Sequence, residues 1–361
     1  MKFVRLMLLV AFIFTLGASD AAAQQTAEDF YKKGVEIMKS GRYEPAIPFF
    51  DEAIKLNSNY VEAFLQRSRA KQNNQMDLKG AFEDVETVLQ INPQMGEAYF
   101  ERAQIRNSLI LKMLKEKGSM TMAEILPFKK LLLEDLNSAI DNGFKNKRIY
   151  SYRAGILSRD FDNQTDAIKD YTAAMSFDPD DFHLLNNRAL AKRQNDDFQG
   201  AIADLREIIR RYDEAKTDNK VSAQKLDSLK GGAVFALNNL SSTYALSEDT
   251  ASQMWAIEKS IELQPTASAY LSRGRHKMIF GSLDDAITDY NKAIEMSGGK
   301  IGRYILDRGI VYHLQGKVTE AQADFEQAVK LEPHLKRSVN YWLELARRQR
   351  EQKRVRVELP K

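Results

Sequence analysis

The sequence predicts an all-α solenoid, in which helices pair into hairpins and the hairpins stack in chain order. Two observations predict it. A pattern of roughly 34 residues recurs along the chain, and within each copy apolar residues return at three- and four-residue intervals in two blocks. Each copy is therefore expected to form two amphipathic helices joined by a turn. Because one helical hairpin cannot bury its apolar face alone, neighbouring copies must pack together.

Proline marks the ends of many copies. Pro93, Pro179, Pro265 and Pro333 each follow the second apolar block. A residue without an amide donor cannot continue a helix, so these prolines predict where the second helices end.

The repeat is clearest near the carboxyl-terminal end. Residues 272–294, SRGRHKMIFGSLDDAITDYNKAI, align without a gap with residues 307–329, DRGIVYHLQGKVTEAQADFEQAV. The frame is repeated upstream with start points at Asn187, Tyr152, Gln66 and, with 17 extra residues, Glu101. Weaker copies begin at Ala27 and cover about 234–265, which gives eight copies in all.

Small residues occupy the eighth, twentieth and twenty-seventh places of a copy, and a proline closes it, as in Gly309, Ala321, Ala328 and Pro333. In this pattern the chain resembles the tetratricopeptide repeat family over residues 27–333. The resemblance implies a right-handed superhelix with a concave groove that binds a protein or peptide. Residues 24–333 are then the repeat array, and residues 334–361 a capping helix followed by a basic tail.

The first residues have the layout of a secretory signal peptide. Lys2 and Arg5 precede the apolar run LMLLVAFIFTLGA, and the small residues of SDAAAQQ follow it. We expect residues 1–23 to be removed after Ala23, with an uncleaved anchor as the alternative. The chain has no cysteine to carry a lipid. These features predict an exported protein, periplasmic or secreted, with no lipid anchor and no membrane-spanning segment after cleavage.

Composition and spacing argue against several classes of function. With 53 basic and 50 acidic residues, the chain lacks the excess positive charge of general nucleic-acid binding. The absence of cysteine excludes thiolate metal sites, and the four histidines have no metal-binding spacing. No serine–histidine–acid arrangement or phosphate-binding loop is recognisable. We expect neither catalysis nor a bound cofactor.

Arginine at the seventh place and aspartate near the twenty-third occur together in six copies and are jointly absent from two. The expected pairs are Arg67 with Asp84, Arg102 with Asp135, Arg153 with Asp170, Arg188 with Asp204, Arg273 with Asp289, and Arg308 with Asp324. Because a guanidinium matches a carboxylate and either charge alone is costly near a helix interface, we expect a ladder of bridges. Independent recurrence through repeat duplication is the alternative.

The resemblance also implies which places face the groove: the second, fifth, ninth, twelfth and thirteenth of the first helix. Among the residues at these places, the candidates for partner contact are Tyr31, Leu65, Arg69, Phe100, Gln104, Asn186, Arg193, Asn238, Leu271, Arg275 and His313. Side-chain amides such as those of Asn186 and Asn238 can hold the backbone of an extended peptide.

Two segments depart from the repeat. The insertion near 109–130 either lengthens both helices of the third copy by about two turns each or adds a short helix. Its apolar residues form either an adaptable contact surface or local packing. The polar segment 213–232, which includes Gly231 and Gly232, is expected to be an irregular linker that extends the flanking helices around a hinge.

Two functions follow from these expectations. The first is a non-enzymatic interaction scaffold of the cell envelope that holds a partner protein or peptide in the groove. The alternative is an envelope module that binds peptidoglycan or anionic lipid through groove arginines and the basic tail RRQREQKRVRVELPK.

Overall fold

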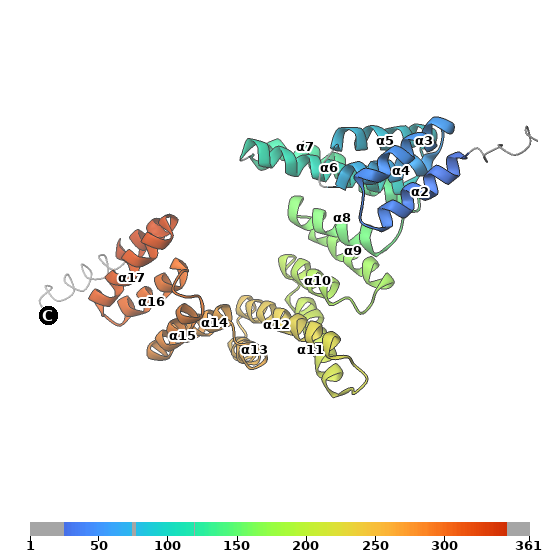
Figure 1. Cartoon of the computed structure of the whole chain (residues 1–361). Helices are drawn as coiled ribbons and strands as arrows, with labels where there is room; N and C mark the ends of the chain where they lie inside the picture. The colour runs from blue at the N-terminus through green and yellow to red at the C-terminus, as the bar shows by residue number, and fades with distance from the viewer. Residues whose placement is uncertain (1–24, 74–76, 119, 345–361) are drawn as a thin grey trace, which may run out of the picture. The chain divides into compact units, whose positions relative to one another are not determined.

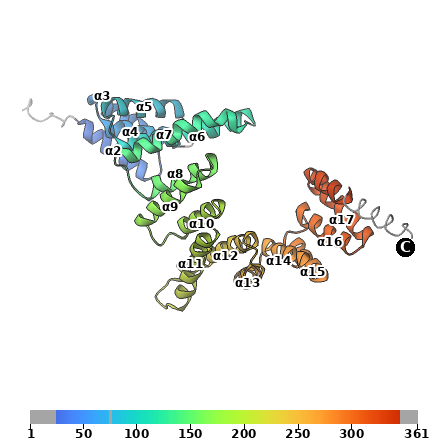
Figure 2. The same ribbon diagram turned by 180° about the vertical axis from the view of Figure 1, so that it is seen from behind.

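The computed structural model describes residues 25–73, 77–118 and 120–344. Within those ranges the chain consists of helices joined by short turns and contains no β-strand. Successive helices pack against each other as hairpins, which confirms the predicted all-α solenoid fold (Figures 1 and 2). The chain divides into two compact units, Met1–Asp162 and Asn163–Lys361.

Unit 1 holds three hairpins and one further helix. The hairpins are α2 (Ala27–Lys39) with α3 (Ile47–Leu56), α4 (Val61–Gln72) with α5 (Leu78–Ile91), and α6 (Gly96–Lys117) with α7 (Met122–Asp141). Helix α8 (Lys147–Asp160) follows, and a short 3₁₀ turn, Glu44–Ala46, precedes α3.

Unit 2 opens with α9 (Gln164–Phe177). Its hairpins are α10 (Phe182–Gln194) with α11 (Phe198–Thr217), α12 (Ala223–Leu246) with α13 (Thr250–Leu263), α14 (Ala267–Ile279) with α15 (Leu283–Met296), and α16 (Gly302–Leu314) with α17 (Val318–Leu331). A 3₁₀ turn, Pro333–Leu335, leads into helical residues 336–344.

Acidic caps start several second helices. The carboxylates of Asp77, Asp197 and Asp249 accept hydrogen bonds from backbone amides three residues on, at 2.8, 2.8 and 3.0 Å. Each cap satisfies an amide that the helix itself leaves without a partner, so the turn between the two helices is fixed locally.

The small residues of the repeat lie where paired helices touch. Ala321 and Ala328 are buried, and a methyl group on Gly309 would lie 2.9 Å from Cβ of Asp324. The aromatic ring of Phe325, at the twenty-fourth place, fills the space beside Gly309 and is also buried. Small residues therefore set the close approach of the helices, as the repeat predicts.

Both segments that depart from the repeat lengthen helices. The insertion near 109–130 lengthens α6 and α7, which have 22 and 20 residues, so the first alternative describes it. Ile125 of the insertion is buried, whereas Leu111 and Phe128 are exposed, so it contributes both to packing and to surface. Over 213–232 both flanking helices are extended: α11 runs to Thr217, α12 begins at Ala223, and residues 218–222 between them are not helical.

The carboxyl-terminal residues cover the last hairpin. Leu335 and Val339 are buried against the core of α16 and α17, with Trp342 packed beside them. The predicted signal peptide and the basic tail lie outside the described residues. None of the helices in the described ranges is long and apolar enough to cross a membrane.

Candidate partner-binding surface

Arginine and aspartate at the predicted ladder positions form bidentate pairs inside the hairpins. In α4 and α5, Nε and Nη2 of Arg67 donate to the two carboxylate oxygens of Asp84, at 3.0 and 2.5 Å. The same geometry, with donor–acceptor distances of 2.7 to 2.9 Å, joins Arg188 to Asp204, Arg273 to Asp289, and Arg308 to Asp324. Arg102 directs both nitrogens to one oxygen of Asp135, at 3.0 and 2.6 Å.

The third guanidinium nitrogen reaches the preceding hairpin. Nη1 of Arg67 donates to Asp51 at 2.6 Å, that of Arg102 to Glu86 at 2.7 Å, and that of Arg308 to Asn291 at 2.7 Å. Each arginine therefore ties together three helices, and the planar fork suits it to this role better than a lysine. The aspartates of these pairs are buried.

A second cation, which the sequence analysis missed, contacts four of the aspartates. It lies four residues after the arginine: Lys71, Arg106, Lys192 and Lys277 approach Asp84, Asp135, Asp204 and Asp289, each at 2.9 Å. The sequence pattern that would have identified this second cation is a basic residue four positions after the ladder arginine, which is one helical turn. In the basic stretch 273–277, Arg273 and Lys277 both contact Asp289 and are thus parts of the scaffold.

The pair Arg153 and Asp170 stays a prediction. Arg153 lies in unit 1, where its Nη1 donates to Asn137 at 2.9 Å, and Asp170 lies in unit 2.

Four of the predicted groove residues are buried, and their assignment as partner contacts is wrong. All four stand at the fifth place of the first helix of their copies: Leu65, Phe100, Leu271 and Asn186. Phe100 packs on the rings of Phe144 and Tyr152, and Asn186 accepts a hydrogen bond from Asn239 at 2.8 Å. The fifth place faces neighbouring helices because the first helices of consecutive hairpins pack together, so these side chains stabilise the core.

Three further candidates, all at the ninth place, bridge consecutive first helices. Arg69 donates to Glu97 and Glu101 at 2.6 Å, and Arg275 forms an ion pair with Asp307 at 2.6 Å. Gln104 accepts a hydrogen bond from Arg148. These side chains fix one hairpin on the next, so the two arginines are already compensated by carboxylates.

The remaining candidates are partly accessible. The Tyr31 ring is tilted against the ring of Tyr60, with centroids 5.2 Å apart, and Asn238 accepts a hydrogen bond from Ser260 at 2.9 Å. Arg193 is half-buried, and burial lowers the pKa of its guanidinium. His313 is half-buried on α16.

An exposed apolar residue ends each of three successive first helices in unit 2. Leu246, Ile279 and Leu314 are 60%, 70% and 49% exposed. They occupy the thirteenth place of their copies, and we call them the apolar row. The sequence analysis named this place as facing the groove but overlooked these residues. The sequence could have identified them, because the alignment of the copies places an apolar residue at this position in all three.

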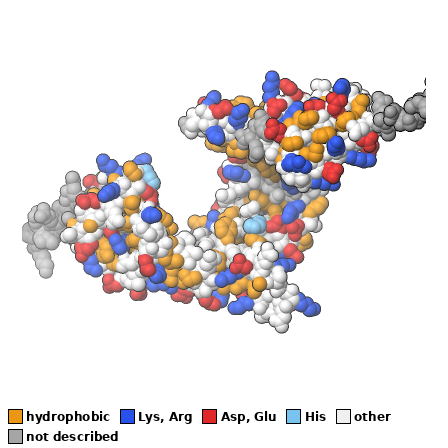
Figure 3. Space-filling view, viewed as in Figure 1, with side chains coloured by type: hydrophobic (Ala, Val, Ile, Leu, Met, Phe, Trp, Pro, Cys, Tyr) orange, Lys and Arg blue, Asp and Glu red, His pale blue; other side chains and the backbone are white. Residues whose placement is uncertain are grey.

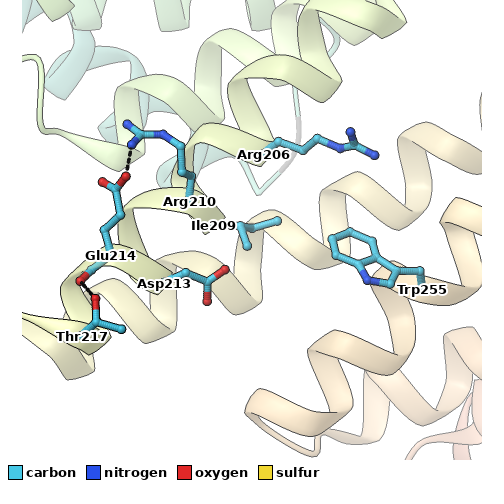
Figure 4. A pocket seen from close by; sticks show the side chains of 7 residues that line it. All are labelled: Arg206, Ile209, Arg210, Asp213, Glu214, Thr217 and Trp255. Carbon is cyan, nitrogen blue, oxygen red and sulfur yellow. Dashed lines mark hydrogen bonds and ion pairs between the residues drawn. The ribbon is translucent and has the colours of Figure 1, made fainter.

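The structure also contains a hollow of about 650 Å³ beside α11 and α13, the second helices of two consecutive hairpins (Figure 4). Arg206, Ile209 and Asp213 of α11 border it, and Trp255 of α13 faces them.

No group of three or more histidine, aspartate and glutamate side chains able to hold a metal ion occurs in the described ranges. His276 is buried, with Nδ1 3.0 Å from Oε1 of Gln253, and burial lowers its pKa.

Comparison with known proteins gives one family. Residues 30–60 and 303–335 match the family model described as tetratricopeptide repeat. These segments correspond to the first and last predicted copies.

Among curated proteins, tetratricopeptide repeat protein 36 of Xenopus tropicalis is 41% identical over 91 residues, which cover 24% of this chain and 45% of that protein. The Homo sapiens protein of the same name is 37% identical over 73 residues, covering 19% and 38%. The chain thus spans less than half the length of these relatives.

Two solved structures of tetratricopeptide repeat proteins are similar to the chain at low identity. YrrB, titled a TPR protein with an unusual peptide-binding site, is 14% identical, with 61% of this chain and 94% of YrrB covered and a TM-score of 0.46. A tetratricopeptide repeat protein from Parabacteroides merdae is 16% identical, with 75% and 93% covered and a TM-score of 0.44.

Proposed function

Because the chain is a tetratricopeptide repeat protein, we propose that it is a non-enzymatic scaffold that binds a partner protein along the first helices of its hairpins. The fold is typical of protein–protein interaction scaffolds. The observation that carries the proposal is the exposure of the apolar row, Leu246, Ile279 and Leu314. The ladder residues, in contrast, are hydrogen-bonded to one another within the hairpins.

The apolar row has the properties of a contact surface. Full burial of one such side chain contributes about 1.5–3 kcal/mol, so a partner that covers all three gains a substantial part of its binding free energy there. Three anchors on consecutive hairpins suit an elongated partner segment. Asn238 and His313 lie on the same helices and supply polar groups beside the anchors.

The charges of the first helices favour this function over binding of peptidoglycan or anionic lipid. Two of the three groove arginines, Arg69 and Arg275, already contact carboxylates, so an anionic ligand at these two would have to displace Glu101 or Asp307. On the face seen in Figure 3, basic and acidic side chains are intermixed and form no broad basic area.

Site-specific photo-crosslinking tests the proposed surface. A benzophenone side chain at position 279 or 314 is expected to capture one major partner protein in cells. The same probe at position 292, an exposed lysine on α15, serves as the matched control and should not capture that protein. Leu246→Asp should reduce capture at position 279 about tenfold, since it removes one apolar anchor and would bury a charge.

Equal capture of the same proteins at positions 279 and 292 would contradict a partner bound along the first helices. So would capture at position 279 that Leu246→Asp leaves unchanged.

We propose that the protein is located in the cell envelope. It is supported by the charged, apolar and small-residue regions of the first 23 residues. N-terminal sequencing of the protein recovered from the expressing cells is expected to begin at Gln24, and fractionation should release it without detergent. A chain that begins at Met1 and stays in the cytoplasmic fraction would refute export.

A further inference from the structure

The hollow beside α11 and α13 lies on second helices and is separate from the apolar row, which belongs to the first helices α12, α14 and α16. Arg206, Ile209 and Asp213 are spaced by three and four residues, so they form one stripe along α11. Figure 4 shows Arg206 and Asp213 on either side of Ile209, with the Trp255 indole across from them.

Two charged groups that border this hollow, Arg206 and Asp213, form no ion pair in the described part of the chain. Nε of Arg206 donates to the hydroxyl of buried Tyr244 at 2.9 Å, which holds the side chain in place. No described residue accepts a hydrogen bond from its two terminal nitrogens. Asp213 forms neither a hydrogen bond nor an ion pair with any residue of the described ranges.

The neighbouring charges, in contrast, compensate one another. Arg210 donates to both oxygens of Glu207 at 2.7 Å and also contacts Glu214. The hydrogen bond from Arg210 lowers the pKa of Glu207 to about 2. Arg206 and Asp213 are therefore the groups available to a ligand, one cationic and one anionic.

The centre of the hollow is apolar. Ile209 forms its floor, and the Trp255 side chain is 45% exposed beside it. A large aromatic side chain left half-exposed across from two charged groups that form no ion pair is typical of a binding anchor.

We infer that this hollow binds a helical segment of another protein whose one face carries an acidic, an apolar and a basic residue. Arg206 and Asp213 are seven residues apart, which is about 10.5 Å along a helix axis. A partner helix that carries these residues at i, i+3 and i+7 repeats that spacing. Its acidic group pairs with Arg206, its apolar group covers Ile209 and Trp255, and its basic group pairs with Asp213.

The test uses Trp255 as the reporter. The chain has two tryptophans, so Trp342→Phe leaves Trp255 alone as the fluorophore. The probe is a blocked, alanine-rich helical peptide of about 16 residues with glutamate, leucine and lysine at i, i+3 and i+7. We expect a saturable change in Trp255 fluorescence, and binding about tenfold weaker to the Arg206→Glu variant.

Charge complementation makes the test specific. A second peptide, in which lysine replaces the glutamate, should bind Arg206→Glu more tightly than it binds the parent protein. Ile279→Asp, in the apolar row, should leave peptide binding unchanged, so failure at the hollow is distinguishable from failure of the proposed scaffold surface. Circular dichroism checks that each variant retains its helical content.

Three outcomes would overturn the inference: no saturable signal, equal affinity for a peptide with glutamine at both charged positions, or unchanged affinity in Arg206→Glu.

Discussion

Asp289→Ala is expected to lower the free energy of unfolding by about 3 kcal/mol, because it leaves two cations without their carboxylate. Arg273 donates to Asp289 at 2.9 and 2.7 Å, and Lys277 lies 2.9 Å from the same carboxylate. The Asp289 side chain is 2% exposed, so water cannot replace it without opening the hairpin. The hydrogen bond to Asp289 raises the pKa of Arg273. A guanidinium stays protonated at ordinary pH even without such a partner, so removing the carboxylate leaves Arg273 charged.

Urea unfolding followed by circular dichroism measures this loss, and hydrogen exchange should place it in α14 and α15. Glu295→Ala is the matched control, because Glu295 pairs with Lys292 on the surface of the same hairpin, and exposed pairs contribute about 0–1 kcal/mol. A loss for Asp289→Ala no larger than that of the control would refute the structural role of the ladder.

Gly302→Ala is expected to destabilise the last hairpin by about 2 kcal/mol through overpacking. A methyl group at this position would lie 2.7 Å from the carbonyl oxygen of Ala328 and 3.2 Å from Cβ of Glu332. The nearest obstacle is backbone, which cannot rotate away as a long side chain does. The start of α16 must therefore move away from α17.

The same substitution at Gly231 is expected to stabilise the protein. Gly231 lies inside α12, and a methyl group there meets nothing within 4 Å. Alanine is the better helix former, so this variant should gain about 0.5–1 kcal/mol. Thermal unfolding of both variants compares them directly. Equal effects of the two substitutions would show that close helix contact at Gly302 does not limit stability.

The fold and the positions of the ladder residues could be predicted from the sequence, because both depend on local patterns that repeat along the chain. The spacing of apolar residues and the closing prolines predicted the paired helices. The joint presence of residues such as Arg308 and Asp324 predicted a contact, which the structure contains at 2.7 and 2.9 Å. Over 213–232 the sequence did not give the bounds of the break between helices, which covers only residues 218–222 and leaves Gly231 and Gly232 inside α12.

Individual partner contacts were less predictable, because exposure depends on what the neighbouring helices cover. Leu65 and Ile279 are both apolar residues on first helices, yet Leu65 is buried and Ile279 is 70% exposed. Leu65 belongs to a buried cluster formed by residues of α4, α5 and α6, whereas Ile279 is the last residue of α14. The hollow next to Trp255 likewise depends on two helices from different hairpins, α11 and α13.

The sequence by itself determined the repeat, the paired helices and the residues that join them, since each of these depends on spacing within one copy. Only the tertiary structure decided which residues remain available to a partner, since packing between copies covers Phe100 and Asn186 and leaves Leu246 and Trp255 in contact with solvent. The physical reason is that one hairpin fixes its own helix faces, whereas burial is set by the hairpins stacked beside it.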